Sequence, residues 1–344
     1  ELVLNNGVDP ATGVQLISVN GKPGRDIEFQ DYDEVWAAWK KFLKFYTDLA
    51  VESDYVCDRS LKKHDSDAFA SSLIDNCMQC GKTLKNGGAE FDFVSQSNIG
   101  TSIIGDALAV LKKLVFEEKK VAFKELRAAL DANWQGEKNQ KMRRLALSVP
   151  KFGNDEDYVD CLTADVYESY LELLPAYHNE RYGRGPFGCG YTMSTSNISS
   201  YVPCGMDVGA TPDGRYAGAP LNEGASPCLG ADRRGPTAVL KSVSKLPNQR
   251  MAGGQLLNMK FSPSALAGED NLEKFVAFLE ANRILGNFHI QFNIVSSEEL
   301  RDAKLHPERH QNLMVRVAGY CALFTSLIPE VQDAIIARTE MAGF

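Results

Sequence analysis

The feature that most constrains the fold of this chain is a run of about fifty residues without a helical period. Residues 182–232 are rich in Gly, Pro, Ser and Asn. Loops of this length inside compact proteins are usually functional. This run separates a mostly helical first part from a second part in which helices alternate with short strands. The pattern predicts an α/β protein, built as a barrel or as a layered sheet.

Four stretches of the first part have apolar residues at three- and four-residue spacing, which is typical of amphipathic helices. They are residues 31–50, 102–116, 123–134 and 157–174. Residues 68–80 are also interpreted as helical. They contain Cys77 and Cys80, which we expect to be two partly buried thiols. Metal binding is a distant second interpretation, because Cys57 and His64 do not supply the second ligand pair that a zinc or iron–sulfur site needs.

The second part combines strand and helix patterns. On residues 288–295, His289, Gln291 and Asn293 face one way and apolar residues face the other. Ser296 followed by Glu299 forms a capping box for the next helix. The other predicted strands are 256–261 and 313–315, and the other predicted helices are 236–246, 271–283 and 329–340.

Charge and composition exclude several classes of function. The net charge is −8 and the pI is near 5.3, which argues against a nucleic-acid or anionic-membrane surface. No apolar run reaches membrane-spanning length, and the chain begins without a signal peptide. A cytoplasmic location is therefore expected. There the eight cysteines stay reduced. The first residues look like the end of a helix, so the chain is interpreted as a piece of something longer.

Gly319 is the candidate catalytic residue. It lies between the predicted strand 313–315 and a helix that begins at Pro329, so it is expected at the tip of a tight loop, where glycine accepts any backbone angle. Its α-carbon carries two hydrogens, and loss of one leaves a flat radical delocalised over the two flanking amides. A lone glycine here is more often a simple turn residue. The surrounding sequence favours the radical.

The run Arg316–Tyr320 resembles the radical loop of the glycyl radical enzymes, the pyruvate formate-lyase-like superfamily. Further blocks resemble the same family and occur in its order, from the N-terminal Leu4–Gly7 to the C-terminal helix. They include Gly209–Arg215, Ala217–Leu221, Ala225–Pro227, Gly235–Ala238, Ser242–Lys245, Leu257–Phe261, His289–Asn293, Arg301–Ala303, His306–Glu308 and Gln332–Thr339. The resemblance therefore covers essentially the whole chain.

The resemblance implies the second half of a ten-stranded α/β barrel in residues 1–205 and a glycine radical domain in residues 206–344. It also implies an anaerobic lyase whose radical is formed after translation by a radical S-adenosylmethionine activating enzyme with an iron–sulfur cluster. The radical loop would be buried, with Cys321 in its buried flank, and the apolar residues 322–324, Leu323 among them, suit such a position. The remaining implications are a small-molecule substrate, a homodimer for the full-length protein, no bound cofactor and no metal.

The chain departs from a complete enzyme of this family. The cysteine that becomes a thiyl radical and its general-base glutamate precede Leu4–Gly7 in relatives, so both would lie upstream of Glu1. Cys189 lies at a different place in the family order, and Cys321 belongs to the loop. We assign a catalytic role to neither, nor to His289, His306, His64, His178 or His310; the last three are expected to be exposed.

Two hypotheses remain open. In the first, the chain is the radical-bearing part of a lyase that cleaves a C–O, C–N or C–C bond. The sequence of its motifs most resembles that of the glycerol dehydratase and choline lyase group. Arylacetate decarboxylases, arylalkylsuccinate synthases and formate acetyltransferases are alternatives. In the second hypothesis, the chain is a non-catalytic radical carrier or one half of a split enzyme.

Overall fold

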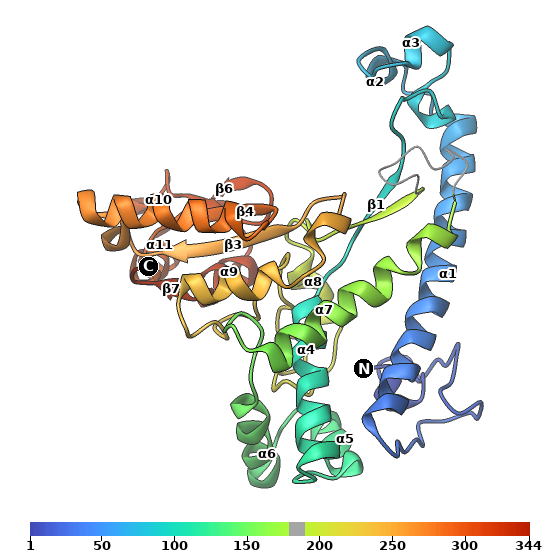
Figure 1. The fold of residues 1–344 in the computed structure, drawn as a ribbon, viewed down its shortest axis with the longest axis vertical. Coiled ribbons are helices and arrows are strands. Elements are labelled where there is room, and N and C mark those ends of the chain that lie inside the picture. Colours follow the sequence, from blue (N-terminus) through green and yellow to red (C-terminus); the bar gives the residue numbers. More distant parts are fainter. Residues whose placement is uncertain (179–189) are drawn as a thin grey trace.

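The computed structural model of the protein describes residues 1–178 and 190–344 (Figure 1). Cys189 lies outside the described residues. Helices and strands alternate, as predicted for an α/β protein. The helices are α1 Tyr32–His64, α2 Ala68–Ser72, α3 Cys77–Cys80, α4 Thr101–Val110, α5 Phe123–Asp131, α6 Glu137–Ser148, α7 Asp157–Leu171, α8 Tyr201–Met206, α9 Pro236–Ser244, α10 Glu269–Ile284, α11 Ser297–Leu305 and α12 Pro329–Ala337. The strands are β1 Val94–Ser97, β2 Tyr191–Ser194, β3 Leu256–Phe261, β4 His289–Ile294, β5 Met314–Arg316, β6 Cys321–Leu323 and β7 Glu340–Met341.

The described strands form three small sheets. β1 pairs with β2 in parallel. β3 lies between β4 and β7 and is parallel to both. β5 and β6 form an antiparallel hairpin. The predicted half of a ten-stranded barrel requires these sheets to join a larger ring of strands, so the barrel stays a prediction.

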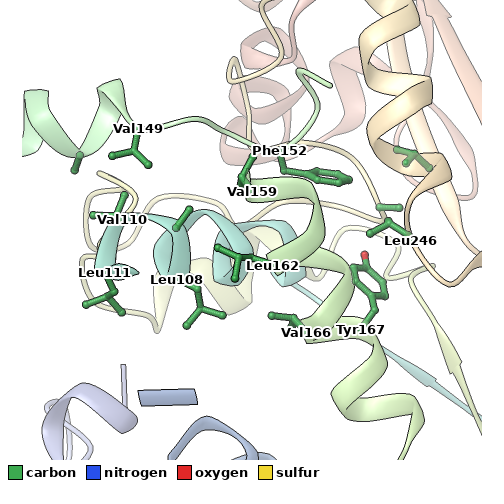
Figure 2. Close-up of a cluster of buried hydrophobic side chains, with 14 of the residues drawn as sticks. Leu108, Val110, Leu111, Val149, Phe152, Val159, Leu162, Val166, Tyr167 and Leu246 are labelled. Carbon is green, nitrogen blue, oxygen red and sulfur yellow. The ribbon is translucent and has the colours of Figure 1, made fainter. Parts of the chain in front are cut away.

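The elements spread around a helical centre. Figure 1 shows the long helix α1 along one side and the strands β3–β7 with α9–α12 on the opposite side, with α4 and α7 between them. The main hydrophobic core lies around α4 and α7 and continues into β3. Figure 2 shows Leu108 near Leu162, with Val166 and Tyr167 farther along α7. The helical first part therefore supports the sheet that carries the C-terminal elements.

A second, smaller core lies under the C-terminal hairpin. It joins α8, α11 and α12 to β5 through Tyr201, Val202, Val295, Leu300, Ala303, Val315, Val317, Phe324, Val331, Ala334 and Ile335. α8 lies inside the 182–232 run, where no helix was predicted. Its burial against α12, rather than a periodic pattern, accounts for this helix.

Several predicted elements have different limits. The helix predicted to end at residue 50 continues to His64, and Asp31 caps its start by accepting a hydrogen bond from the Glu34 N–H. The predicted helix 68–80 is two short helices, broken before Asn76, which has a left-handed backbone (φ 73°). The prediction of two partly buried thiols there is wrong in detail, because Cys77 is buried and Cys80 is exposed.

The closest approach of α4 and α7 occurs at Gly105. A Cβ on Gly105 would lie 2.0 Å from Thr163 Oγ1 and 3.0 Å from Thr163 Cα. We predict that Gly105→Ala lowers the free energy of unfolding by roughly 1–3 kcal/mol, the usual cost of overpacking a core. Thr163→Ala should recover part of that loss in the double variant, as a urea-unfolding double-mutant cycle would measure. Additive losses would contradict this packing.

Candidate active site

Gly319 lies in the turn of the β5–β6 hairpin. Its φ is +84°, in the left-handed region that side chains disfavour. The turn is closed by the Val317 N–H, which donates to the Tyr320 carbonyl at 2.9 Å. The predicted position at the tip of a tight loop after a strand is therefore confirmed.

The predicted burial of this loop is wrong for the chain as it stands. Val317 and Ala318 are buried, but Gly319 itself is exposed. Cys321 is also exposed rather than part of a buried flank. Apolar residues such as Leu323 suggested a buried loop, yet Leu323 is 39% exposed. The hairpin buries one side on the smaller core and leaves its turn open.

Side chains of β4 hold the start of the loop. Asn293 forms a reciprocal pair with the backbone of Arg316. The Arg316 N–H donates to Asn293 Oδ1 at 2.7 Å, and Asn293 Nδ2 donates to the Arg316 carbonyl at 2.8 Å. Gln291 Oε1 accepts from Arg316 Nε at 2.7 Å and from the Gly319 N–H at 3.3 Å. Sequence reasoning placed both side chains on one face of this strand but did not connect them to Gly319.

Arg338 holds the same segment from the other side. Its guanidinium donates to the carbonyls of Arg316 and Val317. It also lies 3.5 Å from the carboxylate of Glu223, and both side chains are almost fully buried. Burial raises the pKa of Glu223, and Arg338 opposes that rise. The helix predicted to reach residue 340 ends at Ala337, and the extended Arg338 follows it.

The loop after β2 approaches the turn of the hairpin. Ser196 Oγ lies 3.2 Å from the position that a Cβ on Gly319 would occupy. Asn197, the next residue, is 3% exposed, and its side-chain amide has no hydrogen-bond partner. Ile198 has φ +55°, a strained conformation for a β-branched residue. Strain of this kind concentrates at functional sites.

The remaining candidate residues lie around or away from this site. Cys321 Sγ accepts from Arg316 Nη1 at 3.3 Å. His289 lies next to Gln291 on β4, and burial, with Arg316 nearby, lowers its pKa. His310 was expected to be exposed but is partly buried, and its ring bonds to Asp302 at 2.7 Å. Among the described residues, the structure therefore gathers Gln291, Asn293, Arg316, Arg338 and Ser196 around Gly319.

One group of side chains has the residue types of a metal site and was not predicted, because its members lie far apart in the sequence. Asp106, Asp213 and Cys228 have ligand atoms within 4.8 Å of one another and line a pocket of about 520 Å³. Burial raises the pKa of Asp106 to about 7, although Lys151 and a hydrogen bond from the Phe152 N–H act against it. The Cys228 thiol donates to Asp106 Oδ2 at 3.2 Å. Burial also raises the pKa of Asp213, so the group is a cluster of acids whose ionisation burial disfavours.

Known protein families match most of this chain. The family described as pyruvate formate lyase-like matches residues 1–205, and the family described as glycine radical matches residues 221–325. The chain belongs to the glycyl radical enzymes of the pyruvate formate lyase-like type. Gly319 lies within the matched glycine radical region.

Relatives of this glycyl radical enzyme chain are dehydratases and lyases. A probable dehydratase of Escherichia coli is 46% identical over 314 residues, which cover 91% of this chain and 39% of that protein. The trans-4-hydroxy-L-proline dehydratase of Clostridioides difficile is 36% identical, over 99% of this chain and 42% of that protein.

Solved structures have the same fold. The B12-independent glycerol dehydratase from Clostridium butyricum, in its glycerol-bound form, superimposes with a TM-score of 0.90 at 35% identity. A structure from Roseburia inulinivorans, described for 1,2-propanediol dehydration, gives 0.92 at 37% identity. Each match covers 99% of this chain and 42% of the other. The chain thus spans about two fifths of its relatives. No helix in the described part of the chain is long and apolar enough to cross a membrane.

We predict that Arg338→Met destabilises the protein by roughly 3–5 kcal/mol, because it leaves the buried carboxylate of Glu223 without its cation. Glu223→Gln should recover part of that loss in the double variant. Chemical unfolding of the two single variants and the double variant measures the coupling. Equal losses in the single variant Arg338→Met and in the double variant would contradict an ion pair here.

We also predict a pH dependence from Asp106. An ordinary aspartate loses its proton near pH 4, whereas folded Asp106 keeps its proton up to a pKa of about 7. The folded state therefore binds more protons than the unfolded state between these values, so this contribution to stability falls as pH rises from 4 to 7. The free energy of unfolding of Asp106→Asn should vary less with pH than that of the wild type. At pH 8 it should exceed the wild-type value by roughly 3–4 kcal/mol. Parallel profiles would contradict the raised pKa.

Proposed function

We propose that this chain is the radical-bearing part of a glycyl radical lyase and that Gly319 stores the radical. The single observation that carries the proposal is the placement of Gly319. It sits in the turn of a hairpin inside the glycine radical match, with φ +84° and its N–H bonded to β4. An α-carbon with two hydrogens, held between two oriented amides, is what a stable carbon radical requires.

The proposed cycle moves single hydrogen atoms. A radical S-adenosylmethionine activating enzyme removes one hydrogen atom from the Gly319 α-carbon. The radical then takes a hydrogen atom from a cysteine thiol, which restores the glycine C–H bond and leaves a thiyl radical. The thiyl removes a hydrogen atom from the small-molecule substrate, and the product radical returns one to it. Each transfer breaks one X–H bond and makes another.

The thiyl cysteine of this proposal is supplied by a part of the protein other than this chain. Gly319 is exposed here, and such a radical needs cover from water and oxygen. Further polypeptide that covers the hairpin would supply both the cover and the cysteine. It either precedes the chain in one longer protein, which then forms a homodimer, or belongs to a separate subunit.

We propose two domains for this chain, and the family matches over residues 1–205 and 221–325 support this division. Residues 1–205 form the C-terminal part of the barrel domain, and residues 206–344 form the glycine radical domain. The bond cleaved is proposed to be a C–O bond next to a substrate radical, as in a dehydratase. This ranking rests on the 46%-identical probable dehydratase and on two dehydratase-related structures of TM-score 0.90 or above.

The test uses the complete protein that contains this chain, activated without oxygen. We expect an EPR doublet from a glycine-centred radical, because one α-hydrogen remains on Gly319. Air should then cut the backbone at Gly319, and mass spectrometry should find the C-terminal peptide that the cut releases. An unchanged mass after activation and aeration would contradict the proposal.

Gly319→Ala should abolish the doublet and the activity. The added methyl group also strains a backbone with φ +84°, so folding needs a matched control. Gly218 has a similar φ of +77° and open space around it, and it lies outside the hairpin. Gly218→Ala should therefore carry the same backbone strain and keep the doublet. A doublet that persists in Gly319→Ala would assign the radical elsewhere.

A further inference from the structure

Gln291, a side chain of β4, accepts a hydrogen bond from Gly319 itself. Gln291 and Asn293 lie two residues apart, so they share a face of the strand, and both are buried, at 6% and 4% exposure. Within residues 1–178 and 190–344, Asn293 bonds to the backbone of Arg316. Gln291 Oε1 instead receives the Gly319 N–H at 3.3 Å together with Arg316 Nε at 2.7 Å. Asn293 therefore anchors the hairpin at Arg316, whereas Gln291 also binds the glycine.

The orientation of the Gln291 amide is determined by its partners. Two donors, the Gly319 N–H and Arg316 Nε, face one end of the amide, so that end is the oxygen. The amide nitrogen at the other end lies 3.0 Å from His289 Nε2. With the amide in this orientation, His289 Nε2 is the acceptor of that bond. A flipped amide would place its NH₂ group against two donors.

This arrangement matters for a radical on Gly319. Such a radical is stable because the α-carbon lies in one plane with both flanking amides, and the amide nitrogen donates electron density to it. A hydrogen bond accepted from the N–H increases that donation, and it also resists rotation of the amide out of the plane. We propose that Gln291 is a positioning residue for the radical: by accepting the Gly319 N–H, it strengthens the electron donation from that amide to the radical carbon once the α-carbon has become flat. This inference rests on the proposed radical role of Gly319.

A purely structural role for Gln291 predicts a different result. If the side chain only anchors the hairpin through Arg316, its loss should resemble the loss of Asn293, which also bonds Arg316 and lies on the same face of the same strand. A role at Gly319 should instead change the electronic structure of the radical, which the Asn293 variant leaves unchanged. Asn293 is therefore the matched control.

The experiment compares Gln291→Leu, Gln291→Glu and Asn293→Ala in the complete protein, activated anaerobically after incorporation of ¹⁵N-glycine. EPR and ENDOR spectra give the nitrogen hyperfine coupling of the radical and its decay under inert gas. In Gln291→Leu we expect a shifted nitrogen coupling and a radical yield or lifetime lowered by roughly three- to tenfold, the range that loss of the bond from the Gly319 N–H gives by itself. Gln291→Glu keeps an acceptor of greater strength, so its coupling should shift in the opposite direction while the radical persists.

Asn293→Ala should lower the radical yield through a looser hairpin but leave the nitrogen coupling at the wild-type value. The inference is overturned if Gln291→Leu and Gln291→Glu both keep the wild-type coupling, or if Asn293→Ala shifts it equally. If Gln291→Leu does not fold, as circular dichroism would reveal, the comparison of Gln291→Glu with Asn293→Ala decides. An absent doublet in the wild-type protein would overturn the proposed function instead, which distinguishes the two failures.

Discussion

The buried carboxylate of Glu223 is the constraint on which the arrangement around Gly319 depends. A carboxylate removed from water is costly unless a cation and hydrogen-bond donors surround it. Here Arg338 supplies the cation, while Ser226 and Asn258 donate to the two oxygens. Asn258 belongs to β3. The need to satisfy one acid therefore joins the irregular middle of the chain, the central strand and the C-terminal segment.

Arg338 transmits this constraint to the hairpin. Its Nη1 and Nη2 donate to two successive carbonyls just before the turn, those of Arg316 and Val317. On the opposite side, the amide of Asn293 matches the N–H and C=O of Arg316 as a neighbouring strand would. The glycine turn is thus positioned by side chains on both sides, so its geometry depends on residue identity more than on sheet pairing.

The sequence predicted best what depends on local pattern. β3 was predicted with its observed limits, and β4 within one residue at each end, because apolar residues alternate or run continuously there. The Ser296 capping box is present, with Ser296 accepting from the Glu299 N–H at 3.0 Å. The tight turn at Gly319 was also predicted, because a glycine between a strand and a helix can adopt the positive φ that a tight turn requires.

Features that depend on distant contacts were not predicted. β1 reads Val-Ser-Gln-Ser, without an apolar alternation, and becomes a strand through pairing with β2 almost a hundred residues later. α6 is mostly polar and buries only Met142 and Ala146. The contact between Gln291 and Gly319 joins residues 28 apart. The exposure of Gly319 was missed because apolar neighbours such as Leu323 indicate a buried loop only when something covers them.

The two separate hydrophobic clusters have a consequence for cooperativity. The hairpin rests on the smaller core of α8, α11 and α12, while α4, α7 and β3 belong to the larger one. Elements with fewer buried contacts open at a lower free-energy cost than the whole domain does. Amide hydrogens around β5 and α12 can therefore exchange through local opening while the larger core stays folded. The residues that hold Gly319 then rest on the smaller of the two cores in the described chain, which can open locally while the larger core stays folded.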